Sequence, residues 1–143
     1  MNRLIIAAIA TSLVIPAIAR ANETIDKAAQ KKGAVKTASG MVYRSIKEGS
    51  GASPTAASIV EVNYRGTLPD GKEFDSSYKR HQSIKFPLSR VIPCWTEGVQ
   101  KMKVGGKAEL VCPPELAYGS RGAGSAVPPN ATLIFEVELL DVQ

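Results

Sequence analysis

Histidine is almost absent from this chain of 143 residues, which contains only His81. His81 stands in a polar stretch and has no second histidine to join it, so we expect neither a metal site nor a His-based catalytic triad. The two cysteines do not form a CxxC motif, and thiol–disulfide exchange chemistry is therefore not suggested. We expect no metal and no other cofactor.

Long apolar runs are also missing. The apolar run over residues 4–18, at about 15 residues, is too short to span a bilayer comfortably. Arg3 before the run and Ala19-Arg20-Ala21 after it are typical of a secretory signal peptide, and no cysteine near the cut could accept a lipid. We expect a cleaved signal peptide over 1–21, no stable membrane anchor, and a periplasmic or secreted location in a bacterium.

The charge of the chain gives little reason to expect a nucleic-acid partner. The predicted signal peptide contains Arg3 and Arg20 and no acidic residue, so its removal lowers the formal net charge from +5 to +3. Lysines gather near the mature N-terminus without interleaved aromatic residues, which favours a solvated tail or helix face. These lysines are Lys27, Lys31, Lys32 and Lys36.

The mature chain has the length and composition of one globular domain. Residues 22–39 include few large apolar residues, and we expect a flexible segment there with at most a short helix. Residues 40–143 then form the folded domain. Its loops include a Gly- and Pro-rich stretch over 115–129 that should stand at the rim of a site.

Five segments of this domain have the pattern of β-strands. The alternation is clear in residues 58–65, where Val60, Val62 and Tyr64 share one face. Pro87 marks another segment as an edge strand or a bulge. The five predicted strands are 41–47, 58–65, 84–88, 107–112 and 133–142. With one helix and no βαβ alternation, they predict an α+β fold in which a five-stranded antiparallel sheet wraps around a short helix.

The predicted helix begins near Pro93, which suits a first helical turn. Trp95, Val99 and Met102 follow at spacings of four and three, so they share one face that must be buried, and Gly98 allows another layer to approach closely. Trp95 alone would be an ordinary core residue. Aromatic residues in other segments and one carboxylate favour an apolar ligand pocket instead. These residues are Tyr64, Phe74, Asp75, Phe86, Tyr118 and Phe135.

Cys94 and Cys112 are the two cysteines of this chain. An oxidising compartment favours a disulfide between them. Cys112 also shares a strand face with Ala108 and Leu110, and this face should meet the helix beginning at Cys94. The alternative is two buried free thiols.

Five stretches of the sequence resemble, in order and spacing, the FKBP-type peptidyl-prolyl isomerases. They are Val62–Gly66, Asp70–Ser77, Val91–Val99, Leu116–Gly119 and Pro128–Leu140. The similarity covers residues 41–143 and is closest to the exported bacterial branch with macrophage-infectivity-potentiator-like members. The resemblance implies a sheet wrapped around the helix, with a pocket between them.

Carried over by matching position, the resemblance implies a role for each pocket residue. Trp95 would form the floor, and Asp75 and Tyr118 would be the polar members. The backbone N–H of Ile92 and the Tyr118 hydroxyl would donate to a bound ligand. The walls would be Tyr64, Phe74, Val91, Ile92 and Phe135, with Ile84 where many relatives have Phe. From the residues alone, Asp75 could instead cap nearby loop donors and Tyr118 could be a turn residue.

The resemblance further implies a peptidyl-prolyl cis–trans isomerase that assists exported proteins. Its partners would be proline-containing polypeptides, and macrolide immunosuppressant-type ligands would bind the same pocket. The alternative is a holdase chaperone that uses the groove without relevant catalysis. A structural protein is disfavoured because the chain offers no repeat or coiled-coil surface. No dimerisation helix of the kind longer relatives carry precedes the domain, and we expect a monomer.

Overall fold

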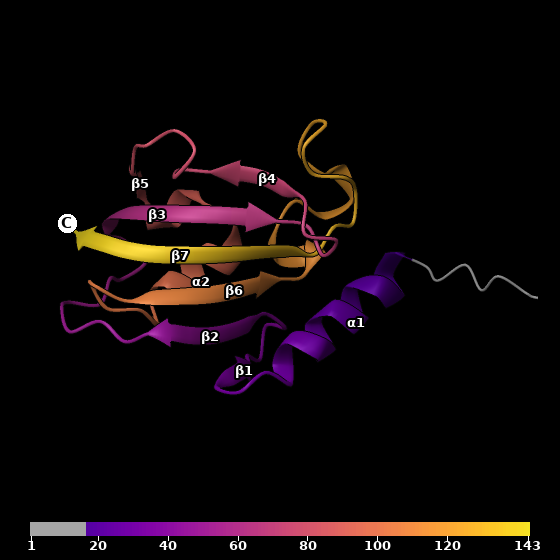
Figure 1. Cartoon of the computed structure of the whole chain (residues 1–143), viewed down its shortest axis with the longest axis horizontal. Coiled ribbons are helices and arrows are strands. Elements are labelled where there is room, and N and C mark those ends of the chain that lie inside the picture. Colours follow the sequence, from indigo (N-terminus) through magenta and orange to yellow (C-terminus); the bar gives the residue numbers. More distant parts are fainter. Residues whose placement is uncertain (1–16) are drawn as a thin grey trace, which may run out of the picture.

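The computed structural model describes residues 17–143 (Figure 1). Over these residues the chain forms an antiparallel sheet of seven strands in the order β1-β2-β6-β7-β3-β4, and β5 pairs with β3 beside this path. The strands are β1 (Ala34–Lys36), β2 (Val42–Lys47), β3 (Ile59–Thr67), β4 (Glu73–Ser76), β5 (Ile84–Pro87), β6 (Lys107–Cys112) and β7 (Leu133–Val142). The helices are α1 (Ala17–Ala29) and α2 (Pro93–Val99), with short 3-10 turns η1 (Leu88–Arg90), η2 (Pro114–Leu116) and η3 (Gly119–Arg121).

The sheet wraps around α2, which lies behind β3, β7 and β6 in Figure 1. The predicted buried face is confirmed for Trp95 and Val99 of α2, whereas Met102 is also buried but lies three residues beyond the end of the helix. Gly98 lies so close to the sheet that a Cβ atom there would stand 2.8 Å from Cδ2 of Leu110. Helix and sheet therefore share one core, and the predicted α+β fold is confirmed.

The longest pairing in the sheet joins β3 to β7, and it sets one face of both strands toward α2. Val60, Val62 and Tyr64 of β3 are buried, as are the alternating residues of β7 that begin at Leu133. On its other side β3 pairs with β5 through its first half and with β4 through its second half. Two short strands thus share one edge of β3, and both carry pocket residues.

The prediction of five strands is wrong at two places. Residues 74–77 have the appearance of a loop in the sequence, yet residues 73–76 form β4, in which Asp75 pairs with Gly66 of β3. Strand β1 pairs with β2 at the other end of the sheet. Both strands have at most four residues, so an alternating pattern has too little length to become visible.

The predicted flexible segment over 22–39 is replaced in the structure by the end of α1 and by β1. Helix α1 covers the outer face of the sheet, where Ile25 and Ala28 pack against Val42 and Val111. Two buried residues three positions apart are enough to fix the helix on the sheet, although they give the segment little overall hydrophobicity. The predicted signal peptide covers residues 1–21, and its residues 1–16 lie outside the described part of the chain.

No helix in residues 17–143 is long and apolar enough to cross a membrane. Lys27 lies on α1, Lys31 and Lys32 lie in the turn after it, and Lys36 lies on β1. Lys27 pairs with Glu23 within the helix at 3.7 Å, and Lys31 reaches Glu109 of β6 at 3.3 Å. These contacts agree with a solvated helix face that also meets the outer side of the sheet.

Candidate functional site

Trp95 lies in the first turn of α2 and is 4% exposed. Pro93 occupies a first-turn position, where its missing N–H costs no helical hydrogen bond. Cys94 forms a disulfide with Cys112 at the end of β6, with 5.7 Å between the two Cα atoms. The Thr96 hydroxyl donates to the carbonyl of Leu88 at 2.7 Å. The turn that carries the indole is therefore tied to β6 on one side and to η1 on the other.

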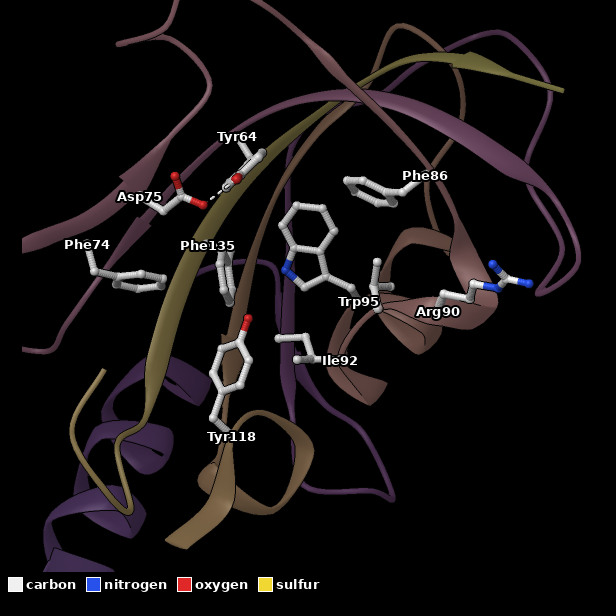
Figure 2. A pocket seen from close by; sticks show the side chains of 10 residues that line it. Tyr64, Phe74, Asp75, Phe86, Arg90, Ile92, Trp95, Tyr118 and Phe135 are labelled. Atoms are coloured by element: carbon white, nitrogen blue, oxygen red, sulfur yellow. Dashed lines mark hydrogen bonds between the residues drawn. The ribbon is translucent and has the colours of Figure 1, made fainter. Parts of the chain in front are cut away.

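Three aromatic rings from the sheet surround the indole of Trp95 (Figure 2). Tyr64 and Phe135 meet it edge to face, with ring centroids 5.1 and 5.2 Å away. Phe86 lies at 5.3 Å in a tilted arrangement, and Phe74 extends the cluster by packing on Phe135 at 5.6 Å. Such edge-to-face pairs are favourable beyond their buried area and hold ring orientations. The result is a rigid apolar basin.

These aromatic rings line a pocket of about 300 Å³. Most of the residues expected at the site line it, although they come from segments spread between positions 64 and 135. The lining residues are Tyr64, Phe74, Asp75, Phe86, Arg90, Val91, Ile92, Trp95, Tyr118 and Phe135.

Ile84 is the exception among the expected wall residues. It packs against the core and is absent from the pocket lining, while Phe86 of the same strand lines the pocket beside Trp95. The two side chains point to the same face of β5, because they stand two residues apart. The wall contributed by β5 is therefore aromatic through Phe86, and Ile84 supports it from the core.

Asp75 projects from β4 at the edge of the pocket. The Tyr64 hydroxyl donates to its Oδ2, and Nη1 of Arg80 donates to its Oδ1 at 2.7 Å. Arg80 also donates from Nη2 to the Tyr64 hydroxyl oxygen at 3.2 Å, which closes a three-membered network. The N–H of Ser76 donates to Oδ1 at 2.9 Å, so the carboxylate also serves as a local cap. Its hydrogen bond from Tyr64, a residue of the aromatic wall, shows that Asp75 does more than cap the N–H of Ser76.

The network changes the acid–base properties of its members. Burial would raise the pKa of Asp75, but hydrogen bonds from Tyr64 and Arg80, together with the charge of Arg80, outweigh burial and lower this pKa. The pKa of Tyr64 is raised, first by burial and then by its hydrogen bond to Asp75. Asp75 is therefore ionised and Tyr64 protonated at neutral pH, so neither group is poised to transfer a proton there.

Ile92 and Tyr118 form the opposite side of the pocket from Asp75. The carbonyl of Ile92 accepts hydrogen bonds from the N–H groups of Trp95 and Thr96 at 3.0 and 3.2 Å. Its own N–H donates to no acceptor in the hydrogen bonds of residues 17–143. Tyr118 precedes η3 and is 42% exposed, and Figure 2 shows its hydroxyl directed toward the aromatic cluster. Both donors are thus free for a ligand.

Two charged residues of the site were missed by the sequence reasoning. Arg80 follows Asp75 by five positions in a polar loop, where nothing in the pattern indicates that the chain turns back onto Tyr64. Arg90 directly precedes Val91 and lines the pocket. Its position beside a matched family stretch is the signal that could have identified it.

The indole N–H of Trp95 is buried and has no hydrogen-bond partner in the described residues. In Figure 2 this nitrogen lies on the side of the indole that faces Phe135 and Tyr118. The described part of the chain also contains no group of three or more His, Cys, Asp or Glu residues that could hold a metal ion. The residues that line the pocket provide apolar surfaces, one ion-paired carboxylate, the guanidinium of Arg90 and a few further hydrogen-bond donors.

Comparison with known proteins connects this geometry to one family. The family model of the FKBP-type peptidyl-prolyl cis-trans isomerases matches residues 51–140. The chain is 50% identical over 125 residues to the FKBP-type peptidyl-prolyl cis-trans isomerase FkpA of Escherichia coli K12, which covers 87% of this chain and 46% of that protein. A protein of the same name from Aeromonas hydrophila is 53% identical over 115 residues, which is 80% of this chain and 42% of that protein.

Solved structures agree with this similarity. A peptidyl-prolyl cis-trans isomerase from Pseudomonas syringae pv. tomato DC3000 superposes with a TM-score of 0.84 at 37% identity, covering 92% of this chain and 98% of that one. The chain spans about half the length of the curated relatives it matches. The family match covers well over half of the chain, and the two relatives agree with it in sequence. This chain therefore belongs to the family of FKBP-type peptidyl-prolyl cis-trans isomerases.

Proposed function

We propose that this protein accelerates the cis–trans isomerisation of Xaa-Pro bonds in exported polypeptides, which bind in the pocket above Trp95. The observation that carries the proposal is the open aromatic basin with one ion-paired carboxylate at its edge. A proline ring is apolar and compact, and an aromatic hollow of about 300 Å³ suits it. The relatives named above support the same activity through their printed names.

The reaction needs no proton transfer. The Xaa-Pro bond rotates slowly because resonance gives its C–N bond partial double-bond character, with a barrier of ~18–20 kcal/mol. Twisting removes this resonance, so the transition state has less charge separation than the planar amide and depends less on water. An apolar pocket therefore favours the twisted form over the planar one. Each ~1.4 kcal/mol of this preference raises the rate about tenfold.

Each residue has a defined part in this mechanism. Trp95 supports the proline ring, and the surrounding aromatic residues exclude water. The Ile92 N–H and the Tyr118 hydroxyl hold carbonyl oxygens of the substrate and so fix its direction across the pocket. Asp75, held ionised by Arg80 and Tyr64, orients the substrate and polarises the site without acting as a general base.

The proposal includes work outside the cytoplasm, in the periplasm or beyond it. A signal peptide predicted at 1–21 would export the chain. The disulfide between Cys94 and Cys112 suits an oxidising compartment, because cytosolic proteins rarely keep structural disulfides. Exported polypeptides rich in proline would then be the substrates.

A protease-coupled assay with a single-proline peptide tests this function. We expect faster cis-to-trans conversion in proportion to protein concentration, and we expect a macrolide ligand of the pocket to abolish the acceleration. The variant Ile46→Ala is a matched control, because Ile46 is an exposed residue of β2 outside the pocket. A folded protein without acceleration would contradict the proposal. If such a protein still suppressed aggregation of a proline-free client, the holdase alternative would replace it.

A further inference from the structure

The pocket contains a positive charge that the mechanism does not use. Asp75 and Arg90 are the two charged residues among those that line it. The charge of Asp75 is balanced by Arg80, at 2.7 Å. Within residues 17–143 Arg90 forms no ion pair, whereas six other basic residues have carboxylate partners within 3.3 Å. The pocket as a whole therefore presents one uncompensated cation to an incoming peptide.

The backbone beneath Arg90 is fixed, although its side chain is exposed. Leu88, two residues earlier, is fully buried and its N–H donates to the carbonyl of Ser58 at 2.9 Å. The Thr96 hydroxyl holds the carbonyl of Leu88 from the other side. Val91 and Ile92, which follow, line the pocket themselves. The side chain of Arg90 therefore extends from a fixed turn beside the pocket, which keeps its charge near that end of the pocket.

Arg90 and Asp75 lie at opposite ends of the pocket in Figure 2, with Trp95 between them. A peptide whose proline rests on Trp95 extends in both directions, and each residue of an extended chain spans about 3.3–3.6 Å. For a peptide that runs from the Asp75 end to the Arg90 end of the pocket, a side chain next to the proline, or one position further, would lie at the end where Arg90 lies. A guanidinium without a partner binds carboxylates well, since its planar fork can donate two parallel hydrogen bonds.

We propose that Arg90 is a specificity-determining residue that favours substrates with an acidic side chain one or two positions from the proline. This inference rests on the isomerase function proposed above and names its substrate class. An exposed ion pair is worth little, so the preference over an uncharged side chain is about two- to fivefold in kcat/KM. It weakens at 1 M salt, where the screening length falls to about 3 Å.

The test compares otherwise identical single-proline peptides that carry Glu, Gln or Lys at the positions flanking the proline. We expect the wild-type protein to process at least one Glu peptide about two- to fivefold faster than its Gln counterpart, with Lys slowest. Arg90→Gln should bring the Glu-to-Gln ratio to one, Arg90→Lys should retain a ratio above one, and Arg90→Glu should invert it in favour of Lys. Lys101→Gln removes an exposed charge outside the pocket and should keep the wild-type ratio.

The experiment distinguishes failure of the inference about Arg90 from failure of the proposed isomerase function. Equal turnover of all three peptides by the wild-type protein, or a ratio that survives Arg90→Gln, overturns the role of Arg90 and leaves the isomerase function intact. Absence of turnover on every peptide refutes the function instead. In that case peptide binding, followed by the fluorescence of Trp95 as the sole tryptophan, still decides the inference. Equal affinities for Glu and Gln peptides would overturn it.

Discussion

Reduction of the Cys94–Cys112 disulfide should lower the free energy of unfolding by about 3 kcal/mol. The bond joins residues separated by 18 positions. For a closed loop of this length, the lost freedom of the unfolded chain gives about 3 kcal/mol in the chain-entropy treatment. Both cysteines are fully buried, so replacing them would also remove packing contacts. Reduction keeps every side chain in place and therefore isolates the effect of the cross-link.

Urea unfolding followed by Trp95 fluorescence measures this difference. Because both sulfur atoms are buried, the protein is reduced while unfolded and is then refolded under reducing conditions. With a urea dependence of about 1–3 kcal/mol per molar, the midpoint should fall by about 1–3 M on reduction. The double variant Cys94→Ala/Cys112→Ala serves as the control, since its midpoint should not respond to reductant. Coincident midpoints for the oxidised and reduced wild-type protein would refute the reasoning.

Three further predictions concern the pocket. Trp95→Ala should cost roughly 3–5 kcal/mol of stability and abolish peptide binding, and a calorimetric loss below about 1 kcal/mol would contradict the burial of the indole. Asp75→Ala should keep the fold, shown by circular dichroism, and lower turnover of a single-proline peptide; unchanged turnover in the folded variant would contradict the role of this carboxylate. Arg80→Gln should raise the pKa of Asp75, because it removes the cation that lowers this pKa. The carboxylate of the wild-type protein stays charged until the pH falls through its lowered pKa, beneath the ordinary 3.8, so turnover should be flat from about pH 8 to 5. Turnover by Arg80→Gln should begin to fall at a higher pH than in the wild-type protein, whereas Lys79→Gln, which loses a contact to Glu73 instead, should keep the wild-type profile.

Periodicity predicted the elements that have two clearly different faces. The buried side of α2 and the alternation in β3 and β7 follow from the spacing of their apolar residues, because each element packs one face against the shared core. Helix α1 has too few large apolar residues to produce such a signal, and β4 is too short for one. Their positions depend on neighbouring strands, through contacts such as Ile25 with Val111 and the pairing of Asp75 with Gly66.

The composition of the pocket was predictable to a similar degree. Its aromatic residues stand out in a chain with 6% aromatic residues, and the family resemblance gave their positions. The roles carried over to Asp75, Tyr118 and Ile92 stay predictions until the variants are measured. The hydrogen-bond partners of Asp75 could not be predicted from the sequence. Arg80 reaches Tyr64 through the fold of a polar loop, and no local pattern encodes a contact of this kind.

The Asp75–Tyr64–Arg80 network bears on the proposed mechanism, in which the pocket lowers the rotation barrier. An unpaired carboxylate at the edge of an apolar basin would retain water, which stabilises the planar and more polar amide. Pairing with Arg80 and Tyr64 satisfies the carboxylate oxygens and so reduces the need for that water. The charge stays in the site as an oriented dipole, while the surface beside the substrate remains largely apolar. In the proposed mechanism, the network therefore allows a charged group to border the apolar surface that would favour the twisted peptide bond.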